Sequence, residues 1–92
     1  MRPSSKTMQE LAIIYAKRAV QEARNDPADA KTYFASARLS AADSAIASRN
    51  LSISLFNDAV AESRAGRDDL AIVLLKESSL AYMDASAFEL MG

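Results

Sequence analysis

The chain has 92 residues, of which 50% are hydrophobic and 25% are charged, so its length and balance are those of one small domain with a thin core. It contains neither cysteine nor histidine, which excludes disulfides, thiolate zinc sites and imidazole catalysis. No apolar run approaches the ~18 residues of a membrane span, and a net charge of −1 does not favour nucleic acid or a membrane surface as a partner.

Residues 1–6 are expected to form a disordered tail ahead of a first helix at about residues 8–24. The stretch Thr7-Met8-Gln9-Glu10 has the pattern of a capping box, in which a hydroxyl and a carboxylate satisfy backbone amides at a helix start. Apolar residues then recur at spacings of three and four, as one buried helix face requires: Met8, Leu11, Ala12, Tyr15, Ala16, Ala19 and Ala23.

A turn at Asn25-Asp26 is expected to end this helix and begin a second one. Asp26 is a favourable N-cap, and Pro27 suits a first helical position because its missing N–H has no partner there. We expect the inner face of the second helix, flanked by Tyr33 and Ile46, to carry Ala30, Phe34, Ala37, Ala41 and Ala45.

The end of the second helix is ambiguous because no glycine or proline lies between Ala28 and Ala65. One long central helix, and so a three-helix fold, is therefore an alternative. The stretch Ser48-Arg49-Asn50-Leu51-Ser52 contains side chains that compete for backbone hydrogen bonds. We favour a break near Asn50.

A third helix is expected at about residues 52–65, with Ile53, Leu55, Phe56, Ala59 and Val60 facing inward. Gly66 suits a left-handed C-terminal cap. Asp68 and Asp69 would begin a fourth helix at its positive end. This helix opens with the apolar run 70–75, so we expect its first turns to be the most buried part of the fold, and its inner face to continue through Tyr82, Ala85 and Phe88.

An internal duplication supports this division. Residues 19–26 match residues 59–66, and with one residue of slip Ala30 matches Ala71. A spacing near 40 is typical of stacked helical hairpins. The predicted fold is all-α: one domain at 7–92 with four helices in two antiparallel hairpins, at about 7–48 and 51–91.

The second copy resembles known repeats between Ala59 and Leu80. Gly66 stands five residues before the small residue Ala71, and Ala59 occupies the small position of the preceding helix. In this spacing the segment is similar to the tetratricopeptide repeat and to the microtubule-interacting and transport (MIT) domain. The resemblance implies a helical-hairpin shape and, by analogy, a protein-binding role.

The C-terminal stretch, residues 81–91, is the best functional candidate because it is apolar around most of the helix circumference. Tyrosine, phenylalanine and methionine are enriched in interface cores, whereas chain ends are usually polar. Ordinary core packing is the alternative. The predicted partner-binding residues are Tyr82, Met83, Phe88, Leu90 and Met91.

A second candidate site is a set of basic residues that could bind a polyanion beside the first turn: Lys17, Arg18, Arg24, Lys31 and Arg38. Asp26 and Asp29 lie within it, and nucleic-acid binders normally carry a denser patch with stacking aromatics. We favour a solvated surface over a binding site here.

No catalytic, cofactor-binding or metal-ligating residues are predicted, since the chain has neither a histidine to activate its serines nor a glycine-rich loop. We therefore expect a cytoplasmic, non-enzymatic protein–protein interaction module without a small-molecule substrate. It would be a small adaptor, chaperone-like subunit or inhibitor that binds a larger protein or a second copy of itself. The alternatives are a small nucleic-acid-binding regulator and a structural subunit of a larger assembly.

Overall fold

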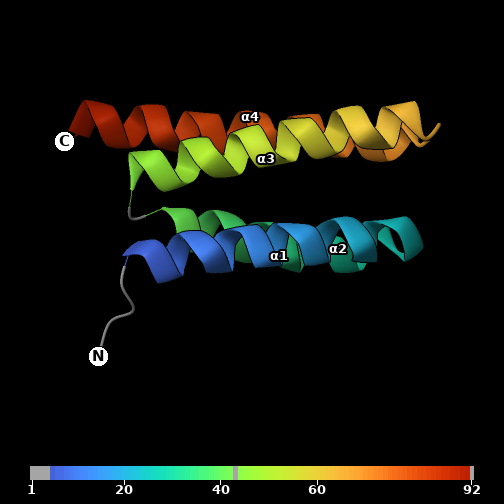
Figure 1. The fold of residues 1–92 in the computed structure, drawn as a ribbon, viewed down its shortest axis with the longest axis horizontal. Coiled ribbons are helices and arrows are strands. Elements are labelled where there is room, and N and C mark those ends of the chain that lie inside the picture. The colour runs from blue at the N-terminus through green and yellow to red at the C-terminus, as the bar shows by residue number, and fades with distance from the viewer. Residues whose placement is uncertain (1–4, 43, 92) are drawn as a thin grey trace.

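A computed structural model describes residues 5–42 and 44–91, and within these residues the chain forms four helices and no strand (Figure 1). Two of them, α1 and α2, form an antiparallel hairpin, and α3 and α4 form a second one. The predicted all-α fold is therefore confirmed, and the alternative with one long central helix is wrong. The helix bounds are Ser5–Asn25 for α1, Pro27–Ala41 for α2, Ala45–Arg64 for α3 and Asp68–Met91 for α4.

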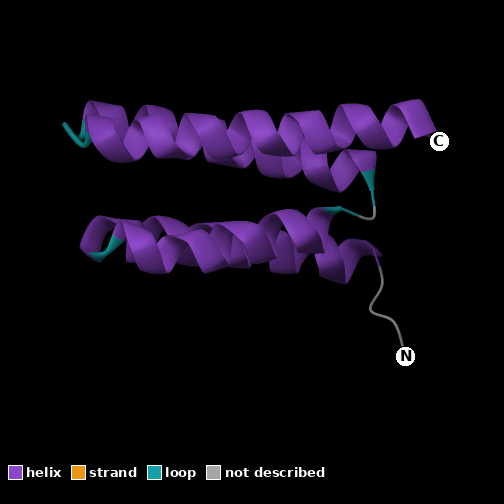
Figure 2. Cartoon of the chain, turned by 180° about the vertical axis from the view of Figure 1, so that it is seen from behind, coloured by secondary structure: helices purple, strands orange, loops and turns teal. Residues whose placement is uncertain are grey.

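The two hairpins lie on each other as two layers. Both hairpin turns are at one end of the molecule, whereas the α2–α3 connection, the start of α1 and the end of α4 are at the other (Figures 1 and 2). The first residues of α1 and α3 are 40 positions apart, and those of α2 and α4 are 41 apart. These offsets agree with the duplication found in the sequence, including its one-residue slip.

The α1–α2 and α3–α4 turns form where local chemistry predicts them. The Ala28 amide donates to Asp26 Oδ1 at 3.0 Å, so Asp26 caps α2 as expected. Gly66 has φ +83°, and the Gly66 and Arg67 amides donate to the carbonyls of Ser63 and Glu62. This pair of hydrogen bonds is a Schellman motif, which needs a left-handed residue at the Gly66 position.

The second helix ends at Ala41 and α3 begins at Ala45, so the predicted break near Asn50 and the predicted place of Ala45 on the second helix are wrong. Ser44 is the N-cap of α3, with its side chain accepting a hydrogen bond from the Ala47 amide. The Ser48 hydroxyl donates to the Ala41 carbonyl, and the Ser52 hydroxyl donates to the Ser78 carbonyl. These hydroxyls bond to other helices instead of their own backbone, so they do not interrupt α3.

The first helix also begins earlier than predicted. It starts at Ser5, so Thr7 of the expected capping box lies inside α1. Lys6 of the expected tail is helical as well. Residues 1–4 of that tail lie outside the described residues.

The core lies where α3 and the first half of α4 meet the alanine-rich inner faces of α1 and α2. Leu51, Leu55 and Leu74 are fully buried there, and Phe34 is nearly so. Leucines of hairpin 2, together with Phe34 of hairpin 1, thus fill the space beside the alanines of hairpin 1.

Several burial predictions on hairpin 2 are wrong, because each of its helices has neighbours on one side only. Ile53 and Phe56 are exposed, since Leu51 and Leu55 occupy the inner face of α3. The opening of α4 is buried only at Leu70, Ala71 and Leu74. The rest of its apolar run lies at the surface: Ile72, Val73 and Leu75.

Candidate functional site

The apolar side chains at the end of α4 are exposed. Tyr82, expected in the core, has 55% of its surface exposed, because the small residues Ala81 and Ala85 occupy the inner face there. For the other predicted partner-binding residues the exposed fractions are 63% at Met83, 38% at Phe88, 89% at Leu90 and 81% at Met91. The end of α4 therefore presents apolar surface that no described residue covers.

Four of these five residues point in two directions. Phe88 and Met91 face α2, where they line a groove of about 430 Å³ together with Leu39, which is itself exposed. Met83 and Leu90 are seven positions apart and therefore lie on the same exposed side of α4, away from α2. The sequence pattern identified these residues but did not separate these two surfaces.

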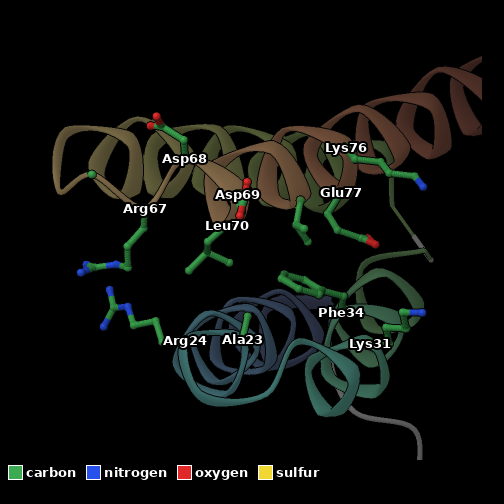
Figure 3. A pocket seen from close by; sticks show the side chains of 12 residues that line it. Ala23, Arg24, Lys31, Phe34, Arg67, Asp68, Asp69, Leu70, Lys76 and Glu77 are labelled. Atoms are coloured by element: carbon green, nitrogen blue, oxygen red, sulfur yellow. The ribbon is translucent and has the colours of Figure 1, made fainter.

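A second hollow lies between the hairpins at the end that carries the turns. This cleft of about 590 Å³ has Phe34, Leu70 and Val73 in its apolar interior. In Figure 3, Arg24 and Arg67 face each other at one edge, and Lys31 and Lys76 lie at the other. Sequence reasoning missed the cleft, because it joins residues from both copies of the duplication.

An ion pair separates the groove from the cleft. Arg38 Nε and Nη2 on α2 donate to Asp84 Oδ2 and Oδ1 on α4 at 3.0 and 3.2 Å. Along α4, Asp84 lies between Glu77 of the cleft and Phe88 of the groove. The side of the bundle formed by α2 and α4 is therefore hollow at both ends and bridged in the middle.

The predicted basic set is largely paired with carboxylates. Lys17 Nζ lies 3.0 Å from Asp58 Oδ1, and Arg18 Nε lies 3.0 Å from Glu22 Oε1. Arg24 and Arg38 bind Glu62 and Asp84, whereas Lys31 has no carboxylate partner among the described residues. Three of these pairs join hairpin 1 to hairpin 2, so the set acts as a contact between the hairpins and offers less positive charge to a polyanion than the sequence indicates.

Glu62 is the most buried of these carboxylates, with only 2% of its surface exposed. It accepts hydrogen bonds from Arg24 and from Arg67. These hydrogen bonds lower the pKa of the Glu62 carboxyl, in the order Arg24 then Arg67, because they favour the ionised form.

The surroundings of Glu77, unlike those of Glu62, disfavour the ionised carboxylate. Its Oε2 atom is buried without a hydrogen-bond partner in the described structure. Burial raises the pKa of the Glu77 carboxyl, while Arg38 and Lys76 act in the other direction. A carboxylate in this position opposes folding when it is ionised.

Among the described residues there is no group of three or more His, Cys, Asp or Glu side chains that could hold a metal ion. The same part of the chain has no helix that is both long and apolar enough to cross a membrane. The two hollows are lined by apolar side chains with flanking charges.

Comparison of the chain with protein-family models, curated proteins and solved structures found no match.

Proposed function

We propose that the chain is a non-enzymatic protein–protein interaction module that binds a larger protein through the C-terminal end of α4. The observation that carries the proposal is the groove between α2 and α4, in which Phe88, Met91 and Leu39 present partly exposed apolar surface. Exposed apolar clusters on small domains usually mark contacts with partners. The role would be that of an adaptor, a chaperone-like subunit or an inhibitor.

The groove suits one apolar anchor from a partner. Arg38 and Asp84 close one end of it with a charge-paired rim, while Leu39 and Met91 form apolar walls. Complete burial of an apolar side chain contributes about 1.5–3 kcal/mol, and 1.4 kcal/mol is a tenfold change in affinity. Loss of both Phe88 and Met91 should therefore weaken binding at least tenfold.

The test compares capture of native-host proteins by three forms of the chain. Wild type and an Ile14→Ser variant should capture the same partner, whereas Phe88→Ser combined with Met91→Ser should lose it. Ile14 is the matched control because it is a similarly exposed apolar residue on hairpin 1. A partner that the double variant retains would contradict the proposal.

Deletion of residues 86–92 provides a second measurement. Ala85 is the last buried residue of α4 in the described structure, so the shortened chain should keep most of its circular dichroism at 222 nm, the helix band, while losing the partner. Unfolding of the shortened chain would show that the segment belongs to the core. The point variants would then carry the test alone.

A further inference from the structure

The outer side of hairpin 2 carries a continuous apolar strip that is separate from the groove. Figures 1 and 2 show α1 and α2 on one side of hairpin 2 only. The other side exposes apolar residues of both helices, and four of them meet in a hollow between α3 and α4. We call the following six residues the outer strip: Ile53, Phe56 and Val60 on α3, and Ile72, Leu75 and Tyr82 on α4.

The spacing of the outer strip is that of a helix-packing seam. On α4 the positions 68, 72, 75, 79, 82, 86 and 89 alternate steps of four and three, and on α3 the strip residues 53, 56 and 60 do the same. Such spacing keeps side chains on one face that can interlock with another pair of helices at a small crossing angle. Of the other four α4 positions, 79 and 86 are serines, which add no charge, and 68 and 89 are acidic residues at the two ends.

Charges are present at both ends of the outer strip, with one sign on each helix. Arg49 and Arg64 flank it on α3, and Asp68 and Glu89 flank it on α4. Arg49 binds Glu89 within the chain, whereas Arg64 makes no ion pair with any described residue. The α3 edge is thus positive and the α4 edge negative. Lys76 does not alter this pattern, because it lies on the side of α4 that lines the cleft (Figure 3).

We propose that the outer strip binds a second copy of this chain, with a two-fold axis parallel to the helices. This axis places α3 of one copy against α4 of the other in antiparallel orientation. Arg64 then meets Asp68 of the second copy at one end, and Arg49 meets Glu89 of the second copy at the other. The apolar residues between these charges pack together, so that α3 and α4 of both copies form a four-helix bundle at the centre of the dimer.

The charge pattern selects this axis over the other symmetric arrangement. A two-fold axis perpendicular to the helices would place α3 on α3 and α4 on α4. Arg64 would then face Arg49 of the second copy, and Asp68 would face Glu89 of the second copy. Like charges held against each other disfavour that arrangement, so the edges of the outer strip are complementary to a second copy in one orientation only.

The first experiment measures mass by light scattering over a concentration series that reaches the millimolar range. Wild type should change from the mass of one chain to that of two. Ile72→Glu should stay at the mass of one chain throughout, whereas the control Ile14→Glu, with nearly the same exposed fraction on hairpin 1, should dimerise as wild type does. Thermal unfolding checks that both variants remain folded.

The second experiment tests the orientation through a surface-exposed charge. Arg64→Glu should weaken the dimer at least tenfold, because the new carboxylate would face Asp68 of the second copy. Under the perpendicular axis the same substitution would instead create an attraction to Arg49 and strengthen the dimer. Strengthening would therefore overturn the proposed arrangement.

Wild type that stays at the mass of one chain at every concentration would overturn the proposal, and so would a dimer that Ile72→Glu leaves intact. A helix of another protein bound to the outer strip would give the first of these results. The proposal does not rest on the groove at Phe88 and Met91, so the double variant of those residues should dimerise normally. Failure of one proposal is in this way distinguishable from failure of the other.

Discussion

Ser52 on α3 and Ser78 on α4 hydrogen-bond to each other reciprocally. Each hydroxyl donates to the backbone carbonyl of the other residue at 2.8 Å, and both residues are buried. The offsets of the duplication place Ala12 and Ala37 at the equivalent positions of hairpin 1, and both are buried as well. Both hairpins therefore use small residues where their helices approach each other, and hairpin 2 adds hydrogen bonds at that point.

This pair gives a stability prediction. The double variant Ser52→Ala, Ser78→Ala should stay folded and lose about 1–3 kcal/mol in free energy of unfolding, since each of the two hydrogen bonds contributes about 0.5–1.5 kcal/mol. Ser52→Leu should cost more, because the added volume separates α3 from α4. Urea denaturation measures both, and a leucine variant as stable as the alanine variant would contradict the close approach.

The carboxylate of Glu62 should stabilise the protein at neutral pH. Glu62→Gln removes a charge that two guanidinium groups bind, and should cost about 1.5–3 kcal/mol in free energy of unfolding. Because the pKa of Glu62 is lowered in the folded chain, this stabilisation is complete above the ordinary carboxyl pKa of about 4.3 and is lost as pH falls through the lowered value. The gap between wild type and variant in urea denaturation should narrow below about pH 4, and a gap that does not change with pH would refute this role.

Ionisation of Glu77 should have the opposite effect and lower the stability of the folded chain. Its pKa is raised in the folded chain, so the folded state holds the proton more tightly and stability falls as pH rises above about 4.3. Glu77→Gln should raise the free energy of unfolding by up to about 1 kcal/mol at neutral pH and make no difference in acid. Thermal unfolding of the two proteins across pH is the measurement, and a variant that is less stable at neutral pH would show that the ionised carboxylate has a partner.

The position of the α2–α3 break can be tested with two substitutions. Ser44→Ala removes the N-cap of α3 and should cost about 1 kcal/mol. Asn50→Ala lies on the exposed surface inside α3, where alanine is the better helix former, so stability should be unchanged or rise by about 0.5 kcal/mol. A larger loss at Asn50 than at Ser44, measured by denaturation, would place the break where the sequence alone suggested it.

Local chemistry was sufficient for two of the three turns. Asp26 followed by proline, and Gly66 at a left-handed position, act through their own backbone and nearest neighbours. The helical spacing of small and large apolar residues likewise predicted the inner faces of α1 and α2. These features depend on residues close in sequence, so they can be read without knowing which helices meet.

The sequence by itself thus determined two helical hairpins, the inner face of hairpin 1 and an apolar C-terminal helix. Only the tertiary structure decided that Ser48 and Ser52 continue a helix and that Ile53 and Phe56 face outward. It also decided that three basic residues of hairpin 1 are paired with carboxylates 38 to 46 positions away: Lys17, Arg24 and Arg38. The physical reason is the same in each case. A hydroxyl, an apolar face or a charge has no assigned partner until a distant helix lies against it, and the partner decides whether that side chain breaks a helix, fills the core or remains at the surface.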